Sequence, residues 1–203
     1  MLLKALRPAL VLLFLLTLVT GVIYPYAITG ISSVVFPHQA GGSLVSVGGK
    51  VVGSALIGQD FESVKYFHGR PSATTGTDAK GNTVPQPYNA ASSAASNYGP
   101  TSKVLMTRVA DDTKKLKAEA AADGTKAPVP VDLVTTSASG LDPDITPAAA
   151  YFQAARVADA RHLPLDKVRT LIAANTSDRA LGFLGEPHVN VLALNLALDK
   201  LAQ

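Results

Sequence analysis

The residues able to perform acid–base or metal chemistry are few and scattered. The four histidines lack the short spacings with which histidines share a zinc ion; they are His38, His68, His162 and His188. Asp142 and Asp144 flank Pro143 just before an expected helix start, where carboxylates complement the helix dipole. Cysteine is absent, which excludes thiol catalysis and a disulfide framework. We therefore predict no catalytic residue and no metal site.

Nucleotide-binding and hydrolase motifs are incomplete. Gly49-Lys50 resembles the end of a phosphate-binding loop, but Leu44 stands where the leading glycine belongs and Val51 where Ser or Thr belongs. Ser96-Asn97 weakly resembles an element of penicillin-binding enzymes, but the S-x-x-K and K-T-G elements are missing. A membrane-anchored periplasmic hydrolase or binding module therefore remains the alternative function.

A polar stretch over residues 68–103 carries the candidate contact residues. Arg70 stands in a short turn with a glycine and a proline, where a guanidinium can make bidentate contacts to a carboxylate. It either contacts a partner or locks the loop onto its own domain. We expect residues 68–72 and 88–100 to lie near each other on one side of the domain. The contact candidates are His68, Gly69, Arg70, Pro71, Ser72, Tyr88, Asn89, Tyr98 and Pro100.

The elements that position these residues begin with an apolar segment. Residues 9–31 contain no charged residue, and a helix of roughly 20 apolar residues spans a bilayer. Lys4 and Arg7 precede it, so the positive-inside rule places residues 1–8 in the cytoplasm and residues 32–203 outside. A cleaved signal peptide is the alternative, but cutting after Ala27 would put Pro25 where a small residue is needed.

Small residues of this segment suggest a packing face within the lipid bilayer. Thr17, Thr20 and Gly21 would let another transmembrane helix approach closely. This face would join the chain to a membrane partner.

The remaining pattern predicts an α+β extracytoplasmic domain after one transmembrane helix. Gly48-Gly49 between two short apolar runs predicts a hairpin, and residues 55–61 continue as a possible strand. Residues 104–122 predict an amphipathic helix that ends before Gly124. Residues 129–135 read as a strand.

The C-terminal third predicts two helices and one ambiguous segment. Thr146 and Pro147 suit the N-cap and first position of a helix that runs to about Arg161. Residues 166–174 form a second helix after Pro164. Residues 189–201 fit a strand and a helix equally.

Charge is nearly balanced along the chain. The net charge is +3 over 203 residues, and Lys4 and Arg7 supply most of the surplus. There is no basic patch by composition, which argues against nucleic acid as a partner.

Several motifs resemble one family in order along almost the whole chain. They are LRPALVLLFLLTLVTGVIYP (6–25), YFHGRPSA (66–73), YNAASSAASNYGP (88–100), VDLVTTSASGLDPDITPAAAYFQAARVADAR (131–161) and VNVLALNLALDKL (189–201). The chain resembles the C subunit of the bacterial Kdp potassium-transporting P-type ATPase. The resemblance implies an accessory subunit of the inner membrane, needed for assembly and activity of a high-affinity potassium uptake complex.

The resemblance also implies partners and a link to ATP. The partners are a channel-like potassium-translocating subunit, the ATP-hydrolysing P-type subunit and a small single-helix subunit. The C subunit is described as a catalytic chaperone that raises the ATP affinity of the hydrolysing subunit, while K+ is the ion the complex transports. The weak candidates for nucleotide contact in this chain are Ser92, Ser93, Ser96 and Asn97.

Two features argue against direct contact with ATP. The expected topology places the soluble domain outside, away from cytoplasmic nucleotide, so an effect on ATP affinity requires conformational coupling. Ala94-Ala95 stands where relatives often carry a Gly-Gly pair, and a loop that brings phosphate to its backbone is expected to keep glycine.

Overall fold

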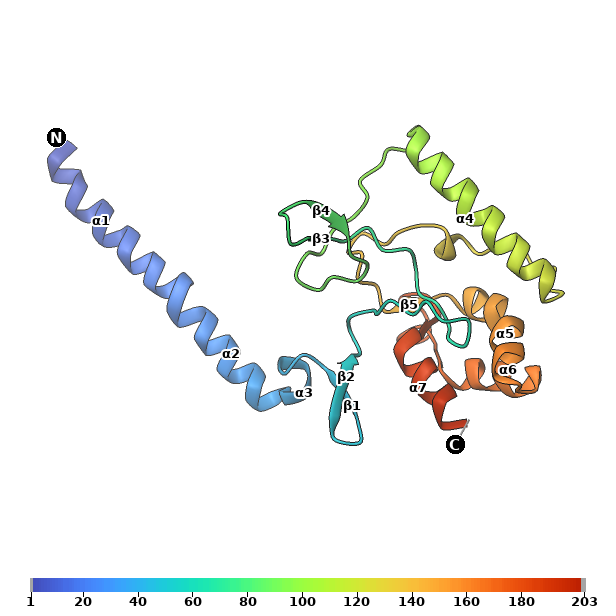
Figure 1. Ribbon diagram of the computed structural model, residues 1–203. Helices are drawn as coiled ribbons and strands as arrows, with labels where there is room; N and C mark the ends of the chain where they lie inside the picture. Colours follow the sequence, from blue (N-terminus) through green and yellow to red (C-terminus); the bar gives the residue numbers. More distant parts are fainter. Residues whose placement is uncertain (1, 202–203) are drawn as a thin grey trace. The chain divides into compact units, whose positions relative to one another are not determined.

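The computed structural model describes residues 2–201. The chain forms two compact units, one up to Val52 and one from Gly53 (Figure 1). One N-terminal apolar helix precedes a mixed α/β unit, which confirms the expected α+β class.

The first unit is dominated by one long apolar helix. It comprises α1 (Leu2–Leu18), a π-helical turn η1 (Val19–Ile23) and α2 (Tyr24–Val35). Its 32 residues from Lys4 to Val35 are long and apolar enough to cross a membrane, and none of this span is buried within the chain. Phe36-Pro37 ends it, as proline requires, and the short α3 (Pro37–Ala40) follows.

The π-helical turn lies just before Pro25. The amide of Tyr24 donates to the carbonyl of Val19, five residues back. Pro25 has no amide hydrogen to donate, and such interruptions are commonly absorbed by a π-turn. Thr20 and Gly21 lie inside this turn, and the Thr20 hydroxyl donates to the Leu16 carbonyl at 2.7 Å.

Two hairpins form where glycine or tight turns allow them. Strands β1 (Leu44–Val47) and β2 (Lys50–Ser54) pair around Gly48 and Gly49, whose φ angles of +58° and +78° fit the predicted turn. Strands β3 (Thr75–Thr77) and β4 (Thr83–Pro85) pair antiparallel inside the polar stretch. That stretch is therefore more ordered than its composition indicates.

The core of the second unit lies between three helices and a small sheet. Helices α5 (Pro147–Arg161), α6 (Leu165–Ala174) and α7 (Val191–Leu201) gather near β5 (Asp144–Ile145) in Figure 1. The antiparallel sheet has the order β5-β7-β6, with β6 at Thr176–Ser177 and β7 at His188–Asn190. The side chains with no exposed surface include Val157, Val168, Ile172, Val189, Leu194 and Leu198.

Helix α4 (Lys103–Ala122) packs on α5 through its C-terminal half, where Ala120 is its one described buried residue. It is the amphipathic helix predicted for residues 104–122. Gly124 follows at a φ of +72°, which a glycine adopts without strain. The predicted caps of α5 are also confirmed, because Thr146 Oγ1 accepts a hydrogen bond from the amide of Ala149.

Two predicted strands are wrong. Residues 129–135 instead contain the 3-10 helix η2 (Val131–Leu133), because Pro128 and Pro130 cannot donate to a sheet ladder. Ala55 and Leu56 form a turn, Ile57 makes an isolated bridge with Ser54, and the amide of Gly58 donates to the carbonyl of Leu141.

The ambiguous segment over residues 189–201 is both strand and helix. Asn190 ends β7, and its side-chain oxygen accepts from the amide of Ala193 at 3.0 Å. This is the N-cap geometry that starts α7.

Gly140 is expected to be sterically irreplaceable. Its φ is +67°, and an added Cβ would lie 2.6 Å from the carbonyl oxygen of Ala94 and 2.7 Å from Thr74 Cγ2. We expect Gly140→Ala to lower the free energy of unfolding by about 3 kcal/mol, from overpacking together with backbone strain. Urea unfolding of the full chain in detergent would measure this.

Gly124→Ala is the matched control. Gly124 also has a positive φ, but nothing lies within 4 Å of its added Cβ. We expect a loss of about 1 kcal/mol from backbone strain alone. Equal losses in the two variants would contradict the tight packing at Gly140.

Candidate functional site

Two buried carboxamides hold the backbone of Phe67 and His68. Asn195 accepts from the Phe67 amide at 2.9 Å and donates to the Phe67 carbonyl at 3.0 Å. Gln153 does the same for His68, at 2.8 and 3.1 Å. Both carboxamides are almost fully buried, at 1% and 4% exposure. Side chains of α7 and α5 thus satisfy the backbone groups that a neighbouring strand would otherwise bind.

Two arginines of α5 bind the backbone of the residues that precede Phe67. Arg156 donates to the carbonyls of Val64 and Tyr66, at 2.7 and 3.1 Å, and to Gln153 Oε1 at 2.7 Å. Burial lowers the pKa of Arg156, although a guanidinium remains charged in proteins.

Arg161 binds the same segment from one turn further along α5. It donates to the Lys65 carbonyl at 2.6 Å and forms an ion pair of 2.7 Å with Asp199 on α7. Its guanidinium also lies 4.7 Å from the centre of the Tyr66 ring, within the range of a cation–π interaction. The segment before the polar loop is therefore fixed by α5 and α7.

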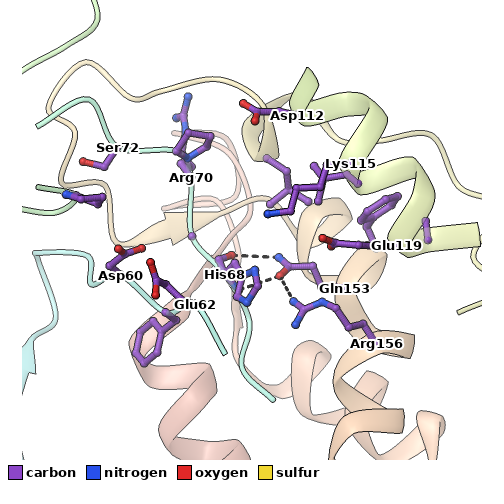
Figure 2. Close-up of a pocket in the computed structure, with 18 of the residues that line it drawn as sticks. Asp60, Glu62, His68, Arg70, Ser72, Asp112, Lys115, Glu119, Gln153 and Arg156 are labelled. Carbon is purple, nitrogen blue, oxygen red and sulfur yellow. Dashed lines mark hydrogen bonds between the residues drawn. The ribbon is translucent and has the colours of Figure 1, made fainter. Parts of the chain in front are cut away.

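A pocket of about 470 Å³ opens where this segment faces α4 and α5. In Figure 2, Lys115 and Glu119 reach from α4 toward His68, while Asp60 and Glu62 lie on the opposite side. Burial, aided by Glu62, raises the pKa of Asp60. The pocket is therefore lined by groups of both charges.

His68 is the titratable group at the centre of the pocket. Burial, with the positive charge of Arg156, lowers its pKa. The imidazole is thus neutral near pH 7, where one nitrogen donates and the other accepts. Its Nε2 lies 3.1 Å from the Ser63 carbonyl, which fixes Nε2 as the donor. Among residues 2–201, no group of three or more His, Cys, Asp or Glu side chains could hold a metal ion.

Arg70 is engaged within its own domain. Its guanidinium forms an ion pair of 3.1 Å with Asp142 and donates to Thr135 and to the Thr136 carbonyl. This geometry supports the interpretation of Arg70 as a lock on the polar loop. Asp142 also accepts a hydrogen bond from the Asp144 amide at 3.1 Å.

Tyr88 joins the two candidate stretches. Its hydroxyl donates to the Arg70 carbonyl at 2.7 Å, and burial raises its pKa. An added Cβ at either Gly58 or Gly69 would overlap the Tyr88 side chain. The polar loop can therefore close over the ring only where these positions lack side chains.

Hydroxyl groups join the same stretches. Ser72 Oγ donates to the Gly140 carbonyl at 2.7 Å and accepts from the Tyr88 amide at 3.0 Å. Thr74, only 2% exposed, donates to the Gln86 carbonyl and accepts from the Asn89 amide. The structure thus brings residues 68–72 together with Tyr88 and Asn89, whereas Tyr98 and Pro100 lie exposed beyond this network.

The weak nucleotide candidates lie against residues 136–139. Ser93 Oγ donates to the Ser139 carbonyl at 3.0 Å, and the Ala94 amide donates to the same oxygen. Ser96 Oγ pairs with Thr136 Oγ1 at 3.2 Å. Asn97 has a φ of +52°, and its side-chain Nδ2 donates to the Ala95 carbonyl. The amide of Ser92 donates to the Asn89 carbonyl, so this segment is already bonded to its own chain.

Sequence reasoning missed the residues that build the site. Gln153, Asn195 and Arg156 hold the segment before the polar loop, and their partners lie 85 to 128 positions away along the chain. Thr74 binds Gln86 within the loop itself. One signal was present: Asn195 interrupts an apolar run, and a buried amide needs partners.

The comparisons with known proteins agree over nearly the whole chain. Residues 6–200 match the family model described as KdpC, K+-transporting ATPase, c chain. A potassium-transporting ATPase KdpC subunit of Bradyrhizobium diazoefficiens is 60% identical over 202 residues, covering 98% of each chain. The subunit of the same name from Rhodopseudomonas palustris strain BisB18 is 61% identical over 199 residues, covering 97% of this chain and 98% of the relative.

Asn195→Leu tests the carboxamide hold. Leucine keeps a similar volume but leaves the buried amide and carbonyl of Phe67 without partners, at a cost of about 1–3 kcal/mol each. We expect a loss of about 3 kcal/mol in the free energy of unfolding, measured by urea titration. Asn82→Leu on the exposed turn is the control, with a change within about 0.5 kcal/mol. An equally small change in the free energy of unfolding for Asn195→Leu would contradict a stabilising role for its hydrogen bonds to Phe67.

Proposed function

The chain belongs to the KdpC family, the c chain of the K+-transporting ATPase, and from this membership we propose that it is an accessory subunit needed for assembly and activity of the complex. The observation that carries the proposal is the match over residues 6–200, which includes both the apolar helix and the second unit. K+ is the ion that the complex transports, and this chain affects transport by binding the other subunits.

The membrane helix anchors the chain in the bacterial inner membrane. Lys4 and Arg7 stand on its N-terminal flank, and the next charged residue in the sequence is Lys50. Under the positive-inside rule the N-terminus lies in the cytoplasm and residues 32–203 form a periplasmic domain. The lipid bilayer is therefore one of the partners of this chain.

Three protein partners follow from this role. They are the channel-like potassium-translocating subunit, the P-type catalytic subunit and the small single-helix subunit. Thr17, Thr20 and Gly21 support a contact within the membrane, because small side chains let helices approach closely. On the domain, the stretches around His68 and Tyr88 form a fixed polar surface suited to a second contact.

The effect on ATP is indirect in this proposal. A catalytic chaperone raises the ATP affinity of the hydrolysing subunit, and from the periplasm this requires conformational coupling between two sites. The bonding of Ser93 and Ser96 to their own chain supports this, because a nucleotide would have to displace those contacts. We infer that ATP belongs to the complex rather than to this domain.

The same bonding weighs against the hydrolase alternative. An attacking serine needs an adjacent base to take its proton. Ser93 donates instead to a backbone carbonyl, and Ser96 pairs with a threonine hydroxyl. We therefore infer that this chain carries no catalytic residue of its own.

Affinity purification with variants in the membrane helix tests the proposal. Tagged wild-type chain in gentle detergent should retain the other three subunits. Gly21→Leu should lower their recovery severalfold, because a bulky side chain keeps a neighbouring helix away. Its own helix offers room, since the nearest atom to an added Cβ is Thr17 Cγ2 at 4.0 Å.

Leu13→Ala is the control on the same helix, and its recovery should match wild type. Recovery of the wild-type chain alone would overturn the proposed role as a subunit. Equal recovery for both variants would show that the face around Gly21 contacts lipid only.

A further inference from the structure

An apolar tip projects from the domain between strands β6 and β7. Leu181, Phe183 and Leu184 are 83%, 69% and 51% exposed. Burying such side chains is worth about 1.5–3 kcal/mol each. The folded domain does not bury these three side chains, which lie within one turn.

The tip has a fixed shape. Ala180 and Leu184 exchange backbone hydrogen bonds of 2.8 and 2.9 Å, and the Gly182 amide donates to the Arg179 carbonyl at 3.0 Å. Below this turn, Arg179 and Glu186 form an ion pair of 2.6 Å. The three apolar side chains are therefore presented by a closed turn.

Leu181 occupies an unfavourable backbone conformation. Its φ is +54°, in the left-handed region where a leucine costs about 1–2 kcal/mol. Glycine or asparagine would adopt this conformation with less strain. The chain instead keeps a strained residue whose large side chain points into solvent, which indicates that the side chain has a use outside the domain.

The tip is joined to the small sheet of the domain core. It connects β6 with β7, the central strand, whose Val189 has no exposed surface. A turn rooted in this way loses little conformational freedom on binding, and such preorganisation favours affinity.

The charges around the tip distinguish a protein partner from a lipid surface. Arg179 is the one basic residue between Asn175 and Pro187, and it is paired with Glu186. Binding of a peripheral loop to anionic lipid is supported by several unpaired cations near the surface. The other charged residues of this stretch, Asp178 and Glu186, are acidic and do not attract anionic lipid. An aromatic and two leucines instead match the apolar anchors found at the centres of protein interfaces.

We propose that Leu181, Phe183 and Leu184 dock into an apolar socket on the extracytoplasmic face of another subunit of the K+-transporting ATPase. This rests on the proposed function, which places the domain beside those subunits. The tip would hold the domain at a fixed position on its partner, in addition to the contact made by the membrane helix.

Site-specific photo-crosslinking in native membranes tests the partner. A benzoylphenylalanine residue at position 183 of the full chain should form one crosslink to a protein subunit of the complex. The same probe at Val131, which is 72% exposed on the same domain, is the control and should form none. Crosslinks from position 183 to lipid, to a second copy of this chain or to nothing would each overturn the proposal.

Leu181→Asn separates docking from folding. Asparagine accepts the left-handed conformation, so the melting temperature should stay equal to wild type or rise. Recovery of the partner subunits should fall about tenfold, the scale of one interface anchor. A lower melting temperature with unchanged recovery would show that the side chain serves only the fold.

A wild-type control keeps the two proposals distinguishable. If the wild-type chain recovers its partners and Leu181→Asn recovers them equally, the docking proposal fails while the proposed function stands. If the wild-type chain recovers none, the proposed function fails first.

Discussion

The arrangement of the domain depends on how the backbone of Phe67 and His68 is satisfied. This segment enters the core without a strand partner, and an unpaired buried amide or carbonyl costs about 1–3 kcal/mol. Asn195 and Gln153 each supply a donor and an acceptor at the right spacing. The polar loop begins at this anchored segment, which two helices hold in place.

The polar stretch is held together by hydrogen bonds from hydroxyl and amide groups, and apolar packing contributes little to it. Thr74 and Tyr88 bond to backbone groups within this stretch, Ser72 bonds to the carbonyl of Gly140, and the lack of a side chain at Gly140 lets the segments approach. A network of this kind is rigid when all its members are satisfied. It gives the domain a fixed polar surface, while the tip at Leu181 supplies a separate apolar one.

Local signals in the sequence predicted several of the helices and the first hairpin, but they did not predict every strand or the residues that build the site. The caps at Thr146 and Pro147 act within one turn, so the start of α5 could be predicted. The strand expected around Val131 failed because proline removed the amides, a local effect given too little weight. The bonds of Asn195 to Phe67 join residues 128 positions apart, and no periodicity reports them. The exposed side of Leu181 likewise became visible only with the turn geometry.

The central claim is that the domain acts from outside the cytoplasm, and cysteine labelling tests it most directly. The sequence contains no cysteine, so single variants give an unambiguous signal. Val131→Cys stands on an exposed site of the domain, and Ala5→Cys lies within residues 1–8, before the uncharged segment of residues 9–31. With a membrane-impermeant maleimide on intact spheroplasts, the account predicts labelling at position 131, and at position 5 only after the inner membrane is opened. Labelling at position 5 alone in intact spheroplasts would contradict it.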